Sequence, residues 1–99
     1  MFNQLFRIIE DRKNHPQPGS YTNLLLNAGE DEILKKIGEE AVEIILAAKN
    51  QGDARLIEEV SDLLYHVFVL ISFRGLQPSQ IVAELERRHQ PNQKLDISK

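Results

Sequence analysis

The chain has 99 residues, of which 41% are apolar and 27% charged, so it accommodates one domain with one modest core and is not largely disordered. Its formal net charge of −3 argues against a general nucleic-acid-binding protein, and the absence of cysteine excludes disulfides, zinc–thiolate sites and thiol nucleophiles. The apolar stretches are too short to span a bilayer and residues 1–11 do not resemble a signal peptide, so we expect a cytoplasmic protein with no membrane partner.

Hydrophobic spacing predicts helices along nearly the whole chain, and therefore an all-α fold. A first helix is expected over residues 2–13. The loop that follows, residues 14–19, contains two prolines and a glycine, which a helix interior does not tolerate. Ser20 is then predicted to cap a short helix over residues 21–28, which Gly29 ends.

Two long helices follow. The first is expected over residues 30–50, with an acidic first turn that suits the positive end of a helix dipole. The second is expected to begin at a cap, Asp53, and to end at residue 73 or 74. Pro78 fits the first turn of a final helix, which should run to about residue 89.

The predicted architecture is a helical bundle built on a long antiparallel helix hairpin. It forms a single domain over residues 1–89, and residues 90–99 are expected to be a frayed tail. The second half of the second long helix is apolar on most sides, because Phe68, Val69 and Phe73 lie outside its main apolar stripe. We expect an isolated monomer to expose this surface and dimerisation to cover it.

Each long helix carries a pair of acids spaced three residues apart: Glu40 with Glu43, and Glu59 with Asp62. This spacing places both side chains of a pair on the same helix face. Across an antiparallel hairpin the two pairs come level, so four carboxylates converge. Glu40 also interrupts the apolar stripe of its helix, which predicts a partly buried cluster.

Carboxylates that converge at a partly buried surface raise each other's pKa, and desolvation adds to the effect. A hard divalent cation relieves this conflict, so we predict that the four acids bind Mg²⁺, for which Mn²⁺ could substitute. The alternative is that the acids are solvated helix faces. We prefer this second interpretation for five other acids on these helices and the last one: Glu30, Glu32, Glu39, Glu58 and Glu86.

The order Glu-x-x-Glu on one helix and Glu-x-x-Asp on the next resembles the all-α nucleotide pyrophosphohydrolases, the MazG-like superfamily. Together with further motifs, it resembles the phosphoribosyl-ATP pyrophosphohydrolase family from the first helix to about Arg88, with Ser61 where alanine is expected. The motifs are Ser20-Tyr21-Thr22-x-x-Leu25, Gly29, Lys36-x-x-Glu39-Glu40-x-x-Glu43 and Glu59-x-x-Asp62-Leu63-Leu64-Tyr65-His66.

The resemblance implies hydrolysis of the nucleotide phosphoribosyl-ATP to phosphoribosyl-AMP and pyrophosphate, the second step of histidine biosynthesis. It also implies Mg²⁺ held by the four acids, a stand-alone form without a cyclohydrolase domain, and a homodimer in which both chains complete the site. Water is expected to attack the anhydride between the α and β phosphates. One of the four acids, or Glu39 through a water, is expected to act as the base.

Hydroxyl and basic groups near the second helix are further candidates for binding substrate. Ser20, Tyr21 and Thr22 offer hydroxyls and free backbone N–H groups at a helix start. The residues alone fit a helix cap equally well, and the resemblance favours substrate contact. Arg12 and Lys13, just before the proline-rich loop, are expected to reach the triphosphate.

Two residues on the long helices have alternative roles. Lys36 lies one turn before Glu40 and either meets a phosphate, which we prefer, or pairs with Glu40 or Glu43. His66 lies one turn beyond Asp62 and either orders a carboxylate or the attacking water at the substrate site, or is a buried structural histidine.

Two other functions remain open at this stage. A housekeeping nucleoside triphosphate pyrophosphatase would share the four acids but would not need Ser20-Tyr21-Thr22 or Tyr65-His66. A catalytically silent helical dimerisation module would bind neither Mg²⁺ nor Mn²⁺.

Overall fold

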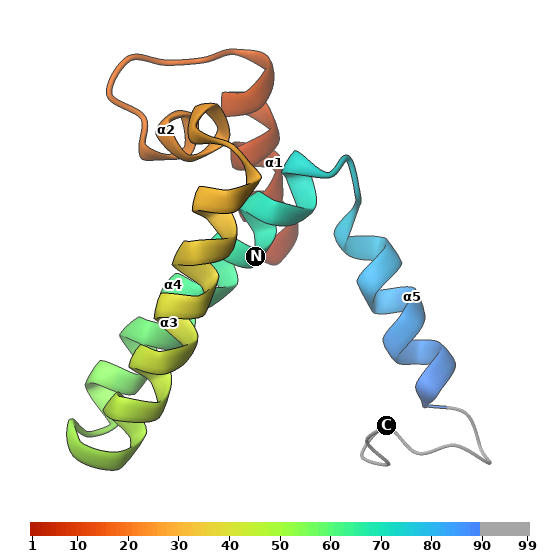
Figure 1. Ribbon diagram of the computed structural model, residues 1–99. Coiled ribbons are helices and arrows are strands. Elements are labelled where there is room, and N and C mark those ends of the chain that lie inside the picture. The colour runs from red at the N-terminus through yellow and green to blue at the C-terminus, as the bar shows by residue number, and fades with distance from the viewer. Residues whose placement is uncertain (90–99) are drawn as a thin grey trace.

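The computed structural model describes residues 1–89. The two longest helices lie side by side as an antiparallel hairpin, and the first two pack at the end of it away from its turn (Figure 1). No strand occurs within residues 1–89, so the predicted all-α class is confirmed. The predicted tail, residues 90–99, lies outside the described residues. The helices are α1 (Phe2–Asn14), α2 (Tyr21–Ala28), α3 (Glu30–Asn50), α4 (Asp53–Phe73) and α5 (Pro78–Arg88).

Local sequence signals set the helix boundaries, and one of the predicted helix caps is wrong. The Ser20 hydroxyl accepts a hydrogen bond from the backbone N–H of Asn23 at 3.2 Å and so caps α2. Pro78 opens α5, as expected. The predicted cap Asp53 is wrong, because it lies inside the first turn of α4 and the cap position is Gly52. The φ angle of Gly52 is 86°, a conformation that glycine adopts readily, and this lets the chain reverse between the long helices.

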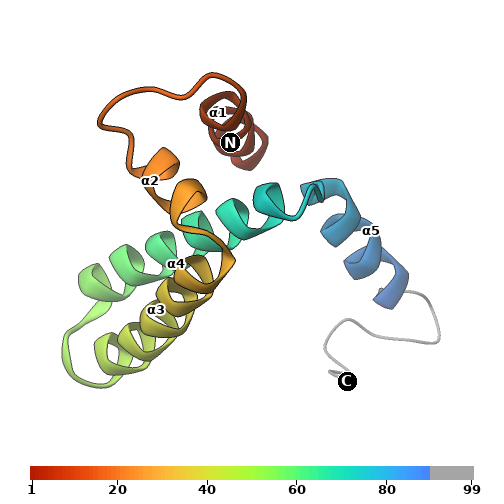
Figure 2. The ribbon, with the colours of Figure 1, turned by 45° about the horizontal axis from the view of Figure 1, so that its top comes forward.

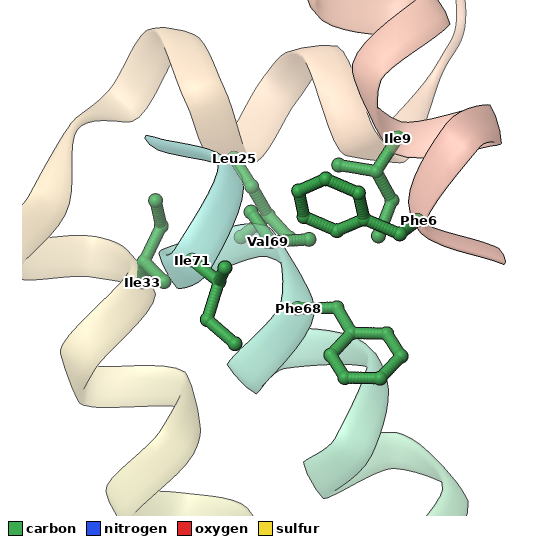
Figure 3. Close-up of a cluster of buried hydrophobic side chains, with 7 residues drawn as sticks. All are labelled: Phe6, Ile9, Leu25, Ile33, Phe68, Val69 and Ile71. Atoms are coloured by element: carbon green, nitrogen blue, oxygen red, sulfur yellow. The ribbon is translucent and has the colours of Figure 1, made fainter. Parts of the chain in front are cut away.

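The hydrophobic core lies where α1 and α2 cross the hairpin. Ile9, Ile33 and Val69 are completely buried there. These three come from different helices, so the core joins α1, α3 and α4 into one unit. The buried cluster consists of Phe6, Ile9, Leu25, Ile33, Phe68, Val69 and Ile71 (Figure 3).

Helix α1 covers the side of α4 that we expected to be exposed in a monomer. The ring of Phe68 meets Phe2 and Phe6 edge-on, at centroid distances of 5.7 and 6.4 Å. The expectation is therefore wrong for Phe68 and Val69, both of which are buried within the single chain. Of the three residues in that prediction, Phe73 alone stays exposed. Helix periodicity showed that this surface is apolar, but not which helix covers it.

Exposed apolar side chains gather instead in two other places. One is α5, which stands apart from the hairpin in both views (Figures 1 and 2) and exposes Ile81, Val82 and Leu85. The other is the half of the hairpin nearest its turn. We call this second group the turn-end apolar face: Val42, Ile45, Leu46, Ile57 and Val60. No helix within residues 1–89 is long and apolar enough to cross a membrane.

Candidate active site

Three carboxylates meet between α3 and α4. Glu40, Glu59 and Asp62 each place a carboxylate oxygen within 4.8 Å of the other two. The antiparallel hairpin brings Glu40 level with Asp62, and the three-residue spacing on α4 puts Glu59 on the same face one turn away. Glu59 is buried, Glu40 is partly buried and Asp62 is exposed, so the cluster is open to solvent on one side.

Glu40 is the acid most perturbed by this arrangement. Burial raises its pKa from 4.5 to about 7, together with a hydrogen bond to Glu59 and the negative charges of Asp62, Glu59 and Glu43. Without a cation, Glu40 therefore keeps a proton up to near-neutral pH. The cluster fits a hard divalent cation on two counts, because three oxygen donors converge and a cation can replace the proton that one of them retains.

The other two predicted acids lie beside this cluster. Glu43 is outside the group of three, but its charge reaches both Glu40 and Arg55. Glu39 is exposed, and its carboxylate lies 3.6 Å from the ammonium of Lys36. Of the four predicted metal ligands, the structure thus gathers three closely and leaves Glu43 as a neighbour. Their binding of a metal stays a prediction.

Arg55 joins the site without having been predicted from the sequence. Its guanidinium Nη2 lies 2.6 Å from Oε2 of Glu59, and its Nη1 donates to Oε1 of Glu58 at 2.8 Å. A buried carboxylate needs a partner for its oxygens, and Arg55 supplies it from the surface. The signal was present, because Arg55 precedes Glu59 by four residues, a spacing that brings opposite charges together on a helix.

The start of α2 packs against α4 one turn beyond the acids. The Tyr21 hydroxyl lies 3.1 Å from Nε2 of His66, and the Thr22 hydroxyl lies 2.5 Å from that of Tyr65. The Tyr21 ring also stacks on Tyr65 at a centroid distance of 6.1 Å and meets His66 edge-on at 5.9 Å. The Ser-Tyr-Thr and Tyr-His motifs, far apart in sequence, are therefore in direct contact.

Lys36 adds a positive charge to this region from α3. Its ammonium pairs with Glu39 rather than with Glu40 or Glu43, the partners considered from the sequence. The pKa of Lys36 is raised, first by the Glu39 carboxylate and then by Tyr21. The Lys36 ammonium is therefore paired with an acid of its own helix.

His66 is only 5% exposed, and both of its ring nitrogens have partners within the protein. Nε2 is near Tyr21, as above, and Nδ1 lies 2.8 Å from the backbone carbonyl oxygen of Asp62. This environment favours the structural alternative for His66 over contact with substrate.

The two basic residues of α1 that were predicted to reach the triphosphate, Arg12 and Lys13, make contacts within the fold. The guanidinium of Arg12 lies 3.1 Å from the Asp11 carboxylate, and its backbone carbonyl accepts a hydrogen bond from the side chain of Asn23 at 2.7 Å. Lys13 donates to the backbone carbonyl of Ser72 at 2.7 Å, which ties α1 to α4. Contact of either side chain with a triphosphate stays a prediction.

Comparison with known proteins settles the family. The family model described as phosphoribosyl-ATP pyrophosphohydrolase matches residues 2–89, which include all five described helices. The chain belongs to this family. The resemblance found in the motifs of the phosphoribosyl-ATP pyrophosphohydrolases is thereby confirmed.

Individual members of the family are similar to this chain over most of their lengths. A phosphoribosyl-ATP pyrophosphatase from Pelotomaculum thermopropionicum is 51% identical over 86 residues, covering 87% of this chain and 88% of its own. One from Bacillus cereus is 49% identical over 88 residues, covering 89% of this chain and 82% of its own. One from Clostridium acetobutylicum is 43% identical over 90 residues, covering 91% of this chain and 82% of its own.

Proposed function

We propose that the protein hydrolyses phosphoribosyl-ATP to phosphoribosyl-AMP and pyrophosphate, the second step of histidine biosynthesis. The observation that carries this proposal is the group of three converging carboxylates, one of them protonated near neutral pH, in a member of this family. Glu40, Glu59 and Asp62 would hold Mg²⁺, or Mn²⁺ in its place, and Glu43 would supply further negative charge. When bound, the cation neutralises substrate phosphates and lowers the pKa of a bound water.

The chain's own donors bind and orient the phosphates. Lys36 provides a positive charge beside the acids, and the first turn of α2 provides backbone N–H groups that have no partner within the helix. Ser20 can contribute as well, because a hydroxyl that accepts a hydrogen bond at a helix cap still has its proton to donate. These groups stabilise the negative charge that develops on the phosphate oxygens during attack on the α–β anhydride.

The attacking water must also lose a proton. We propose Glu39 as the base, acting through a second water, because it is exposed and is not needed to hold the cation. Any of the four predicted metal ligands, Glu40, Glu43, Glu59 and Asp62, remains the alternative base.

Pyrophosphate release from phosphoribosyl-ATP tests the proposal directly. With Mg²⁺ present, we expect release from phosphoribosyl-ATP at least about a hundredfold faster than from dCTP, dUTP or ITP, because the phosphoribosyl group adds binding energy that the others lack. Addition of EDTA should stop it. Release from the ordinary triphosphates alone would instead support a housekeeping pyrophosphatase. No release from any of them would support a silent dimerisation module.

We also propose that the protein is a homodimer whose second chain completes the site. The turn-end apolar face and the apolar side of α5 support this, since both are exposed in the single chain. Sedimentation equilibrium is expected to give twice the chain mass of 11.4 kDa. Ile57→Glu, in the middle of the turn-end apolar face, should give a helical monomer with much lower activity. A wild-type monomer, or a fully active monomeric variant, would contradict the proposal.

A further inference from the structure

The hydrogen bonds of His66 define which of its ring nitrogens carries the proton. Nδ1 lies 2.8 Å from the backbone carbonyl oxygen of Asp62, and a carbonyl oxygen can only accept. Nδ1 must therefore be protonated. In the neutral ring Nε2 then has a free lone pair, so the hydroxyl of Tyr21, 3.1 Å away, must donate to it.

This direction decides what Tyr21 can offer on its exposed side. Its only proton points at His66, so its oxygen can accept but cannot donate to a phosphate. The side chain is nevertheless 44% exposed, and its ring is fixed by the stack on Tyr65 and the edge contact with His66. The group suited to its remaining lone pairs is a hydrogen-bond donor.

We propose that His66 is a positioning residue that never touches the substrate: it fixes the Tyr21 hydroxyl as an acceptor, so that Tyr21 receives a hydrogen bond from a donor group of the substrate. The inference rests on the proposed function and changes two roles that were expected from the sequence. Tyr21 accepts a hydrogen bond from the substrate instead of donating one to a phosphate. His66 also links Tyr21 to the backbone of Asp62, so Tyr21 keeps a fixed position relative to the acidic cluster.

Two conservative variants of His66 separate its two hydrogen bonds. In His66→Gln the side-chain amide oxygen reaches the position of Nε2 and can accept from Tyr21. In His66→Asn the amide nitrogen replaces Nδ1 and leaves Tyr21 without an acceptor. We expect kcat/KM to fall about tenfold in His66→Asn and in Tyr21→Phe, and about twofold in His66→Gln, since only the first two lose the bond to Tyr21.

The double variant Tyr21→Phe with His66→Asn tests whether the two residues act together. Because both changes remove the same bond, we expect it to be no worse than either single variant. The loss should lie mainly in KM, whereas a fold defect would lower the active fraction and hence kcat alone. Effects that multiply to about a hundredfold, or equal losses in His66→Gln and His66→Asn, would overturn the proposal.

The tautomer provides a readout that does not depend on activity. Long-range ¹H–¹⁵N NMR spectra of the free protein should show the buried His66 ring protonated at Nδ1 only. Protonation at Nε2 would overturn the assigned direction of the bond to Tyr21. If the wild type released no pyrophosphate from phosphoribosyl-ATP, the proposed function would fail, and with it the role of Tyr21 and His66 in substrate binding. The NMR result would still decide the geometry by itself.

Discussion

Glu40→Gln and Asp62→Asn are each expected to lower kcat/KM for phosphoribosyl-ATP by at least about a thousandfold. Each change keeps the shape of the side chain but removes a carboxylate oxygen that could carry negative charge toward a bound cation. The helical fold should survive, because Asp62 is exposed and Glu40 is already largely neutral in the metal-free protein below its pKa of about 7. Pyrophosphate release and circular dichroism measure the two effects.

Glu58→Gln is the matched control for this pair. Glu58 is an exposed acid on α4 directly beside Glu59, and it lies outside the group of three carboxylates. Its loss should change kcat/KM by no more than about threefold, as expected for an exposed ion pair with Arg55. Wild-type rates in either cluster variant, or an equal loss in Glu58→Gln, would show that the three carboxylates are not the catalytic centre.

Removal of the cation with EDTA is expected to abolish turnover and to make stability depend on pH. The folded pKa of Glu40 is about 7, above its ordinary value of 4.5, so between these values the folded chain holds a proton that the unfolded chain has lost. The contribution of Glu40 to the free energy of unfolding is therefore fully present below pH 4.5 and is lost as the pH rises through 7. After allowance for solvent screening, we expect the free energy of unfolding to fall by about 1 kcal/mol over this pH range. This corresponds to a fall of about 4–8 °C in melting temperature.

Adding Mg²⁺ should reverse both effects. Turnover returns, and the pH dependence of the melting temperature flattens because the cation replaces the Glu40 proton. Calorimetry in buffers of different ionisation enthalpy should detect about one proton released on binding at about pH 6, and almost none at about pH 8. Glu40→Gln is the control and should show neither the pH dependence nor the proton release. A melting temperature of the wild type in EDTA that is constant from pH 4.5 to 7 would contradict this account.

The features of the fold that were predictable from the sequence are those that depend on neighbouring residues. Ser20 and Pro78 mark helix starts because capping and the fixed φ of proline act within one turn. Asp53 was misassigned since Gly52 supplies the backbone conformation that the turn requires. The cover that α1 provides for Phe68 was not predictable, because periodicity shows which face is apolar but not which helix packs on it.

The same division applies to the site. Glu40 and Asp62 were predictable as neighbours because a hairpin and a helical repeat are enough to bring them level. The pairing of Glu59 with Arg55 was not singled out, since most acid–base pairs four residues apart are ordinary surface pairs. The contact between Tyr21 and His66 depends on how α2 crosses α4, which no local pattern in either helix encodes.

The connection between α3 and α4 consists of Gln51 and Gly52 alone, and evolution must preserve its length to keep the active site. Each added or deleted residue advances a helix by about 100°, which would carry Asp62 out of line with Glu40 unless the turn adapted. The length of the loop between α1 and α2 does not affect how the acids of α3 and α4 align. Insertions are therefore expected to accumulate there among related proteins, while the number of residues from Glu40 to Asp62 stays constant.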